Sequence, residues 1–132
     1  NLTLIQKDIT VFEEEEAFDV IFTFDSVHDQ ADPAAVLANI HRALKSDGIY
    51  LMQDIAGSSD VEKNKAHPLG PFIYTISCIH CMSVSLAQGG AGLGAMWGEE
   101  LAEQMSRSAG FSSFEKKTLE HDIINNFYIL QK

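Results

Sequence analysis

The chain has 132 residues, 45% of them hydrophobic, and a formal net charge of −10 at pH 7. This size and composition predict one globular domain with a core of its own and argue against intrinsic disorder. The acidic balance argues against sequence-independent binding of nucleic acid and against binding to an anionic membrane surface, since both need clusters of Lys and Arg.

Neither a membrane segment nor a targeting segment is expected from the sequence. No apolar run reaches the roughly 18 residues that a membrane-spanning helix needs, and the first residues lack the pattern of a signal peptide. The 2 cysteines are too few for a secreted disulfide scaffold. We therefore expect a cytoplasmic protein with no membrane partner.

Two strands are expected near the start of the chain. Leu2 to Ile5 is a short apolar run that predicts a strand. Residues Phe18 to Phe24 are almost all apolar, and Val20 and Ile21 among them are β-branched. Continuous runs of this kind are typical of strands that are buried on both faces of a parallel sheet.

A helix and a third strand follow. Asp32 and Pro33 predict a helix start, with Asp as the N-cap and Pro in the first helical position. Apolar residues recur at helical spacing up to Leu44, and Gly48 predicts the end of the helix. Ile49 to Met52 predicts the next strand. Strand, helix and strand within about 35 residues are the βαβ pattern of an α/β fold with a parallel sheet.

The second half of the chain predicts two more helices and a hairpin. Phe72 to Ala87 is an apolar run that predicts a helix, and the glycine-rich stretch "QGGAGLG" after it predicts a flexible hinge. Trp97 to Ala109 predicts an amphipathic helix that Gly110 ends. Phe111 to Leu119 and Asp122 to Leu130 predict two strands joined by a short turn, which give the sheet an antiparallel edge.

Polar and acidic residues follow each of the first three predicted strands. In open α/β sheets, ligands bind beyond the carboxyl ends of the strands, so these residues are expected at one rim. They are Asp8 after the first strand, Asp25, Ser26, His28 and Asp29 after the second, and Gln53 and Asp54 after the third.

His28 and Asp54 are the most informative pair among them. A His titrates near neutral pH, and a nearby carboxylate fixes its tautomer and stabilises its cation, so the pair predicts a general base. This requires the two strands to be neighbours, which the βαβ pattern predicts. The residues alone leave a second interpretation equally open, in which His28 only caps the end of its strand.

The stretch "CIHC" raises the question of a metal site. Cys78, His80 and Cys81, with His67 as a further candidate, are of the types that bind zinc. A single C-x-x-C lacks the second pair of a structural zinc site, however, and it lies in an apolar helical run where both thiols are expected to be ordinary buried residues. We therefore expect no bound metal.

These stretches resemble a known family. "KDIT", "FDVIFTFDSVHDQADPAAVLANIHRALKSDGIYLMQDIAG" and "AGFSSFEKKTL", followed by a hairpin, are similar to the C-terminal half of class I S-adenosylmethionine-dependent methyltransferases. The resemblance covers nearly the whole chain. It implies an α/β fold with a partial Rossmann-like sheet that is mostly parallel, closes with a C-terminal antiparallel β-hairpin, and has helices packed on it.

The resemblance also implies a cofactor, S-adenosylmethionine, and residues that bind it. The acidic residue after the family's third strand, here Asp8, contacts the adenine, and the following residue, here Ile9, packs on the ring. Asp25 and Ser26 match the turn that lies near the methionine end of the cofactor.

Within the family, "VHDQADP" is similar to a stretch of small-molecule O-methyltransferases whose His is the general base. His28, followed by Asp29, takes that place, and Asp54 matches the carboxylate that holds the base. Two positions depart from the pattern, since Gln30 stands where the family has Trp and Phe24 stands where a Lys is expected. The resemblance implies methyl transfer to an oxygen or nitrogen atom of a small-molecule acceptor.

The family's glycine-rich turn and its ribose-binding acid have no counterpart in this sequence. We therefore expect residues 1–132 to be the C-terminal portion of one methyltransferase domain and to be inactive alone. Residues 66–97 are expected to form a helical insertion, either a substrate lid or an ordinary helix packed on the sheet. The alternative function is a non-catalytic α/β binding or dimerisation module, and a homodimer is compatible with both.

Overall fold

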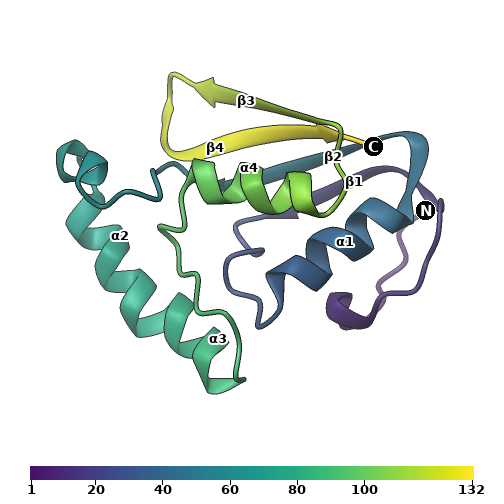
Figure 1. Cartoon of the computed structure of the whole chain (residues 1–132), viewed down its shortest axis with the longest axis horizontal. Helices are drawn as coiled ribbons and strands as arrows, with labels where there is room; N and C mark the ends of the chain where they lie inside the picture. Colours follow the sequence, from purple (N-terminus) through teal and green to yellow (C-terminus); the bar gives the residue numbers. More distant parts are fainter.

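A four-stranded sheet organises the computed structural model, which describes residues 1–132 (Figure 1). Its strands are β1 (Phe18–Phe24), β2 (Leu44–Ile55), β3 (Ser113–Leu119) and β4 (Asp122–Gln131), in the order β1-β2-β4-β3. β1 and β2 are parallel, whereas β4 is antiparallel to both β2 and β3. The expected α/β class and the closing antiparallel hairpin are confirmed, and β1 with β2 forms the parallel pair of this chain.

The crossover from β1 to β2 contains helix α1 (Pro33–Ala43). Its start is as expected, because the Asp32 side chain accepts a hydrogen bond from a backbone N–H of the first turn at 2.9 Å. The expected end at Gly48 is wrong. The backbone N–H of Ala17 donates to the carbonyl of Ala43 at 2.9 Å, which satisfies a terminal helix carbonyl, and the chain turns directly into β2.

The strand expected at residues 2–5 is not formed. No strand pairs with these residues, and the side chains of Leu2, Leu4 and Ile5 are exposed. A lone extended segment has no partner for its backbone N–H and C=O groups, so an apolar run by itself does not make a strand. The first regular element is instead the short 3-10 helix η1 (Ile9–Val11).

One long helix stands beside the sheet, at the end where β2 leads out (Figure 1). It follows the short 3-10 helix η2 (Lys63–Ala66) and consists of α2 (Gly70–Ile76), the π-helical turn η3 (Ser77–Cys81) and α3 (Met82–Ala87). These 18 residues are long and apolar enough to cross a membrane, and 28% of them are buried. The expectation that no apolar run has this length is therefore wrong, although core helices meet the same criterion.

Helices α1 and α4 (Glu99–Ser108) cover one face of the sheet. The main core lies between them and includes Tyr50, Met52, Tyr128 and Leu130 of the strands and Leu37 and Ala102 of the helices. Because side chains alternate across a strand, other strand residues face the opposite side. There Val20, Phe22 and Phe24 are 45%, 55% and 61% exposed. The strand that was expected to be buried on both faces is therefore covered on one.

Candidate active site

β1 and β2 end side by side, and this pairing determines where the site lies. Phe24 is the register partner of Gln53, so the residues that follow, Asp25 and Asp54, lie at the same rim of the sheet. Asp25 has a φ of 49°, a left-handed conformation that turns the chain out of the strand. The loop that follows brings His28 against Asp54.

His28 and Asp54 form a buried hydrogen-bonded pair. The His28 Nδ1 lies 2.7 Å from the Asp54 Oδ1, and the two side chains are 2% and 1% exposed. The backbone N–H of Ile55 donates to the same carboxylate oxygen at 2.8 Å, so the carboxylate is held in place. Because an ionised carboxylate only accepts, Nδ1 carries the proton and Nε2 is the nitrogen that can accept one.

Two more carboxylates face the same imidazole. Asp29 Oδ1 lies 3.3 Å from Nε2, and Asp25 Oδ1 lies 4.0 Å from Nδ1. Burial lowers the pKa of His28, but the hydrogen bond and charge of Asp54, and then the charges of Asp29 and Asp25, raise it, and the net pKa lies above the usual value. The site therefore favours the imidazolium form.

A cavity of about 350 Å³ opens onto these groups. Asp25, His28 and Asp29 supply polar groups to it. Its apolar wall includes Ile55, Leu69, Phe72, Ile73, Ile76 and Ala95. A mostly apolar chamber with a few polar groups is the usual form of a small-molecule site.

The inner face of the long helix forms part of the cavity wall. Ile73, Ser77, Cys81 and Ser85 recur at every fourth position along this face, and all of them are buried. The Ser85 hydroxyl donates to the carbonyl of Gln30 at 2.9 Å, which ties the helix to the loop after β1. The helix is therefore attached to the segment that carries the candidate base.

Cys81 is a residue of this cavity to which the sequence assigned no role. It is 4% exposed and lies on the same cavity as His28 and Asp29. Burial, and then the facing Asp29, raise the pKa of the Cys81 thiol to about 12. The signal that could have found it is the constant spacing of small residues along the helix, which indicates a face that packs closely.

The glycine-rich segment after the helix is a packed connection, in contrast to the flexible hinge expected from its composition. A Cβ atom on Gly90 would lie 2.4 Å from the Cα of Ala31, and one on Gly94 would lie 2.3 Å from the Ser77 Oγ. The backbone N–H of Ala91 donates to the carbonyl of Ala31 at 2.9 Å. These glycines therefore let the segment pass close to both the helix and the loop after β1.

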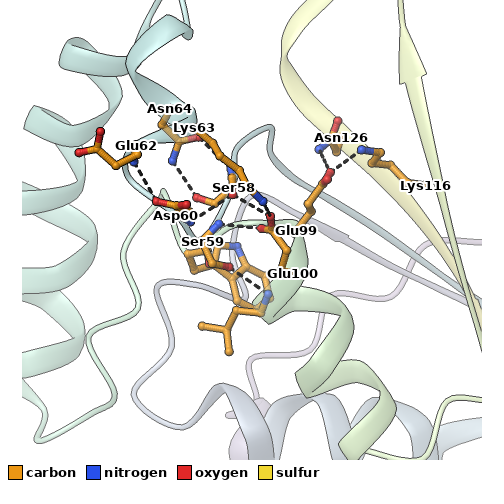
Figure 2. Close-up of polar contacts among 12 residues, drawn as sticks. Ser58, Ser59, Asp60, Glu62, Lys63, Asn64, Glu99, Glu100, Lys116 and Asn126 are labelled. Atoms are coloured by element: carbon orange, nitrogen blue, oxygen red, sulfur yellow. Dashed lines mark hydrogen bonds and ion pairs between the residues drawn. The ribbon is translucent and has the colours of Figure 1, made fainter.

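A polar network fixes the other end of the long helix (Figure 2). Glu100, in the first turn of α4, accepts hydrogen bonds from the Ser59 N–H and the Ser58 hydroxyl, both at 2.7 Å. These bonds, the Ser59 N–H first, lower the pKa of Glu100 to about 2. Asn64 donates to the carbonyl of Ser58 at 2.7 Å and to the Tyr74 hydroxyl at 2.9 Å. The connection from β2 to the helix is therefore anchored to α4.

The other candidate cofactor residues lie in two places. The Asp8 carboxylate accepts hydrogen bonds from the Thr10 N–H at 2.8 Å and the Thr10 hydroxyl at 2.7 Å, which makes Asp8 the N-cap of η1. Ile9 lines a second, apolar cavity of about 230 Å³ between η1, β1 and α1. Asp25 lines the first cavity, and Ser26 follows it in the same loop.

The residues of "CIHC" do not gather into one cluster. Cys78 and His80 are exposed, whereas Cys81 is buried. The clusters of metal-ligand residue types are instead His28 with Asp29 and Cys81, and Asp25 with His28 and Asp54.

The sheet and its rim define an α/β domain of the Rossmann-like class, in which ligands bind beyond the carboxyl ends of parallel strands. A family model described as a methyltransferase domain matches residues 1–110. The chain therefore belongs to the methyltransferase domain family. A comparison with curated protein sequences gave no match.

Several solved structures share the fold. PigF with SAH has a TM-score of 0.69 at 20% identity, and the match covers 95% of this chain and 34% of that one. An O-methyltransferase family protein from Burkholderia thailandensis has a TM-score of 0.64 at 19% identity, with 95% and 33% covered. Human N-acetylserotonin methyltransferase in complex with SAM has a TM-score of 0.62 at 20% identity, with 97% and 33% covered. The chain thus spans about a third of the length of these structures.

Proposed function

We propose that the complete protein is an S-adenosylmethionine-dependent methyltransferase and that residues 1–132 are the C-terminal portion of its catalytic domain. The observation that carries the proposal is the His28–Asp54 pair, 2.7 Å apart and next to a cavity of about 350 Å³. Membership of the methyltransferase domain family supports it. The acceptor is a small molecule that presents an oxygen or nitrogen nucleophile.

The residues of the chain fit two ends of the cofactor. Ile9 would pack on the adenine ring, since it lines an apolar cavity, and Asp8 would contact the ring edge through the oxygen that does not bind Thr10. Asp25 and Ser26 would hold the methionine end, because the charge of Asp25 suits an ammonium group. When bound, the cofactor supplies a methyl group activated by a sulfonium.

His28 would act as the general base. Asp54 holds the Nδ1–H, which leaves Nε2 to take the proton of the acceptor hydroxyl or amine. Asp54 and Asp29 then stabilise the imidazolium that forms, Asp29 from 3.3 Å. Asp54 acts through His28 and is therefore a positioning residue, whereas Asp29 lies where the acceptor approaches Nε2.

Residues 66–97 would cover the acceptor. Phe72, Ile73 and Ile76 of the long helix line the cavity, and an apolar cover excludes water from the transfer. The bond of Ser85 holds the helix itself, and the bonds of Glu100 hold the connection that leads into it, which favours a fixed cover over a hinged lid.

The chain alone would bind the cofactor poorly and would be inactive. It supplies neither a glycine-rich turn for the cofactor nor an acid for the ribose hydroxyls, and it spans about a third of the solved structures it matches. The alternative of a non-catalytic module is not favoured, because the chain keeps a buried His–Asp pair beside a cavity.

We also propose that the complete protein is cytoplasmic and forms a homodimer. It would bind neither nucleic acid nor membrane. The net charge of −10 supports the absence of polyanionic partners. Cell fractionation and the solution mass of the complete protein test these points.

The experiment is a binding titration with S-adenosylhomocysteine and a turnover assay on the complete protein. We expect the wild type and His28→Ala to bind S-adenosylhomocysteine equally, while His28→Ala loses at least about 10²-fold in turnover. His121→Ala, in the exposed turn between β3 and β4, is the control and should keep full turnover. Undiminished turnover in His28→Ala would refute the base, and absence of binding to the wild type would refute the cofactor.

A further inference from the structure

Cys81 has no part in the proposed methyl transfer, yet it lies against the groups that do. Its Sγ, a ring nitrogen of His28 and a carboxylate oxygen of Asp29 all lie within 4.8 Å of one another. The thiol comes from the π-helical turn η3, whereas the other two come from the loop after β1. Three different donor atoms from two distant segments therefore converge at one point of the cavity wall.

The imidazole of His28 is held in an orientation that leaves Nε2 free to bind a metal ion. Its Nδ1 is bound to Asp54 Oδ1 at 2.7 Å, and the N–H of Ile55 holds that carboxylate. Metal-binding histidines almost always have their second ring nitrogen held in this way by a carboxylate, a carbonyl or a water, which fixes the tautomer and the direction of the ring.

Asp29 supplies an independent observation. Its Oδ1 lies 3.3 Å from the His28 Nε2 and is buried without a hydrogen-bond partner. A buried carboxylate oxygen needs a donor or a cation opposite it, and in the imidazolium form the Nε2–H faces this oxygen from 3.3 Å. A divalent cation bound between the two atoms would take the place of that proton.

We propose that Cys81, His28 and Asp29 form a binding site for a zinc-type divalent cation. The ligands are the Cys81 thiolate, the His28 Nε2 and the Asp29 carboxylate, and the fourth position is open to the cavity. A set of sulfur, nitrogen and oxygen suits zinc, whereas magnesium and calcium prefer oxygen alone. Binding forms the metal–sulfur bond and releases the thiol proton to solvent, with no redox change.

The site has a consequence for activity that rests on the proposed function. A cation on Nε2 occupies the lone pair that would accept the proton, so the bound metal inhibits methyl transfer. The cation would be bound by a different residue set from the "CIHC" stretch, for which the sequence predicts no metal. Cys78 of that stretch is exposed, and His80, although it lines the cavity, does not belong to the cluster of His28, Asp29 and Cys81.

Cobalt(II) added to the metal-free complete protein is the probe. We expect a thiolate-to-cobalt charge-transfer band and the visible bands of a tetrahedral ion, both lost when zinc displaces cobalt. Cys81→Ser should lose the thiolate band and bind cobalt at least about tenfold more weakly. Cys78→Ser, exposed and three positions away in the same helix, is the matched control and should keep both.

Asp29→Asn is a second variant, in which the Cys81 thiol itself is kept. It should weaken cobalt binding about tenfold or more while the thiolate band persists at saturation. Absence of the thiolate band in the wild type would overturn the site, as would a band that survives in Cys81→Ser.

The inhibition is measured separately, as turnover with and without zinc. Each rate with zinc is compared with the metal-free rate of the same protein. Zinc should reduce the turnover of the wild type and of Cys78→Ser at least about tenfold, and it should reduce the turnover of Cys81→Ser by a smaller factor. Zinc binding without loss of turnover would overturn the inhibitory role. A metal-free enzyme that transfers no methyl group would instead contradict the proposed function, while the cobalt spectrum still decides the metal site.

Discussion

Asp54 has one carboxylate oxygen with two partners and one with none. Oδ1 accepts from His28 and from the N–H of Ile55, whereas Oδ2 is buried without a hydrogen bond. Few other donors therefore stabilise the negative charge of this carboxylate, and the imidazole of His28 is its main partner. Both the tautomer of His28 and its raised pKa depend on that charge.

Asp54→Asn tests this dependence in the metal-free complete protein. A base works when deprotonated, so wild-type turnover should rise with pH and level off only above the usual pKa of His, which Asp54 raises. The amide removes the charge and lowers the pKa of His28, so the inflection should move to lower pH. Turnover at the plateau should fall by about 10²- to 10⁴-fold, because the amide no longer selects the productive tautomer.

The measurement is a pH–rate profile of both proteins. Asp47→Asn, which removes an exposed acid of β2, is the control and should keep the wild-type profile. An inflection that stays in place in Asp54→Asn would contradict the role given to its charge.

The sequence could predict the meeting of His28 and Asp54 but not that of His28 and Cys81. The first pair follows two strands of one βαβ unit, and parallel strands end at the same rim. Cys81 reaches the cavity because of how a helix 50 positions further along lies against the loop after β1. That placement depends on packing of Gly90 and Ser85 against backbone, which no local pattern encodes.

At the scale of elements, the glycine-rich segment controls how close the helix lies to the loop after β1. Gly90 has no room for a Cβ atom, since the nearest atoms are the Cα and carbonyl oxygen of Ala31. Backbone atoms cannot move aside as a flexible side chain does. Any side chain at this position must therefore push the loop and the segment apart.

Gly90→Ala should lower the free energy of unfolding of the complete protein by about 1–3 kcal/mol, because overpacking forces a backbone shift. It should also lower turnover, since the displaced loop carries His28. Gly89→Ala is the matched control. Gly89 has a φ of 70° and open space around it, so this change should cost about 1 kcal/mol of backbone strain and leave turnover unchanged. Urea unfolding and a turnover assay measure both effects, and equal losses of turnover would contradict the expectation.

The sequence predicts helices and strands well where a local pattern of residues determines them. It predicts them poorly where hydrogen bonds with a distant segment determine whether an element forms or where it ends. Phe18–Phe24 and α1 start where the apolar run and the Asp32 cap predict. The end of α1 is missed because a backbone N–H of Ala17 satisfies the helix terminus before Gly48 is reached. The strand at residues 2–5 is wrong because strand formation needs a neighbour, which an isolated apolar run does not reveal.

At the scale of the whole molecule, the second face of the sheet decides how the chain behaves alone. Val20, Phe22 and Phe24 are exposed there, and β1 is an edge strand with no partner on its outer side. Exposed apolar patches and unpaired edges both promote association. Residues 1–132 by themselves are therefore expected to associate.

Light scattering after size exclusion should give residues 1–132 a mass of at least a dimer. Replacing both Phe22 and Phe24 by Ser should shift the chain towards the monomer. Phe72→Ser, which removes an equally exposed ring from the long helix, is the control and should leave the mass unchanged. A monomeric wild-type chain would contradict the expectation.

The π-helical turn at Ser77–Cys81 decides which side chains meet the acids. In a regular α-helix, residues four apart drift by about 40° per step around the axis, so Ile73 and Ser85 would be separated by about 120°. The wider turn winds less per residue and keeps the stripe of buried residues on one side. Deleting one residue there would preserve almost all of the composition but rotate α3, so that a different side chain replaced Ser85 at the loop. Which side chains of the helix face the cavity and the loop after β1 thus depends on the number of residues in this turn as well as on their identity.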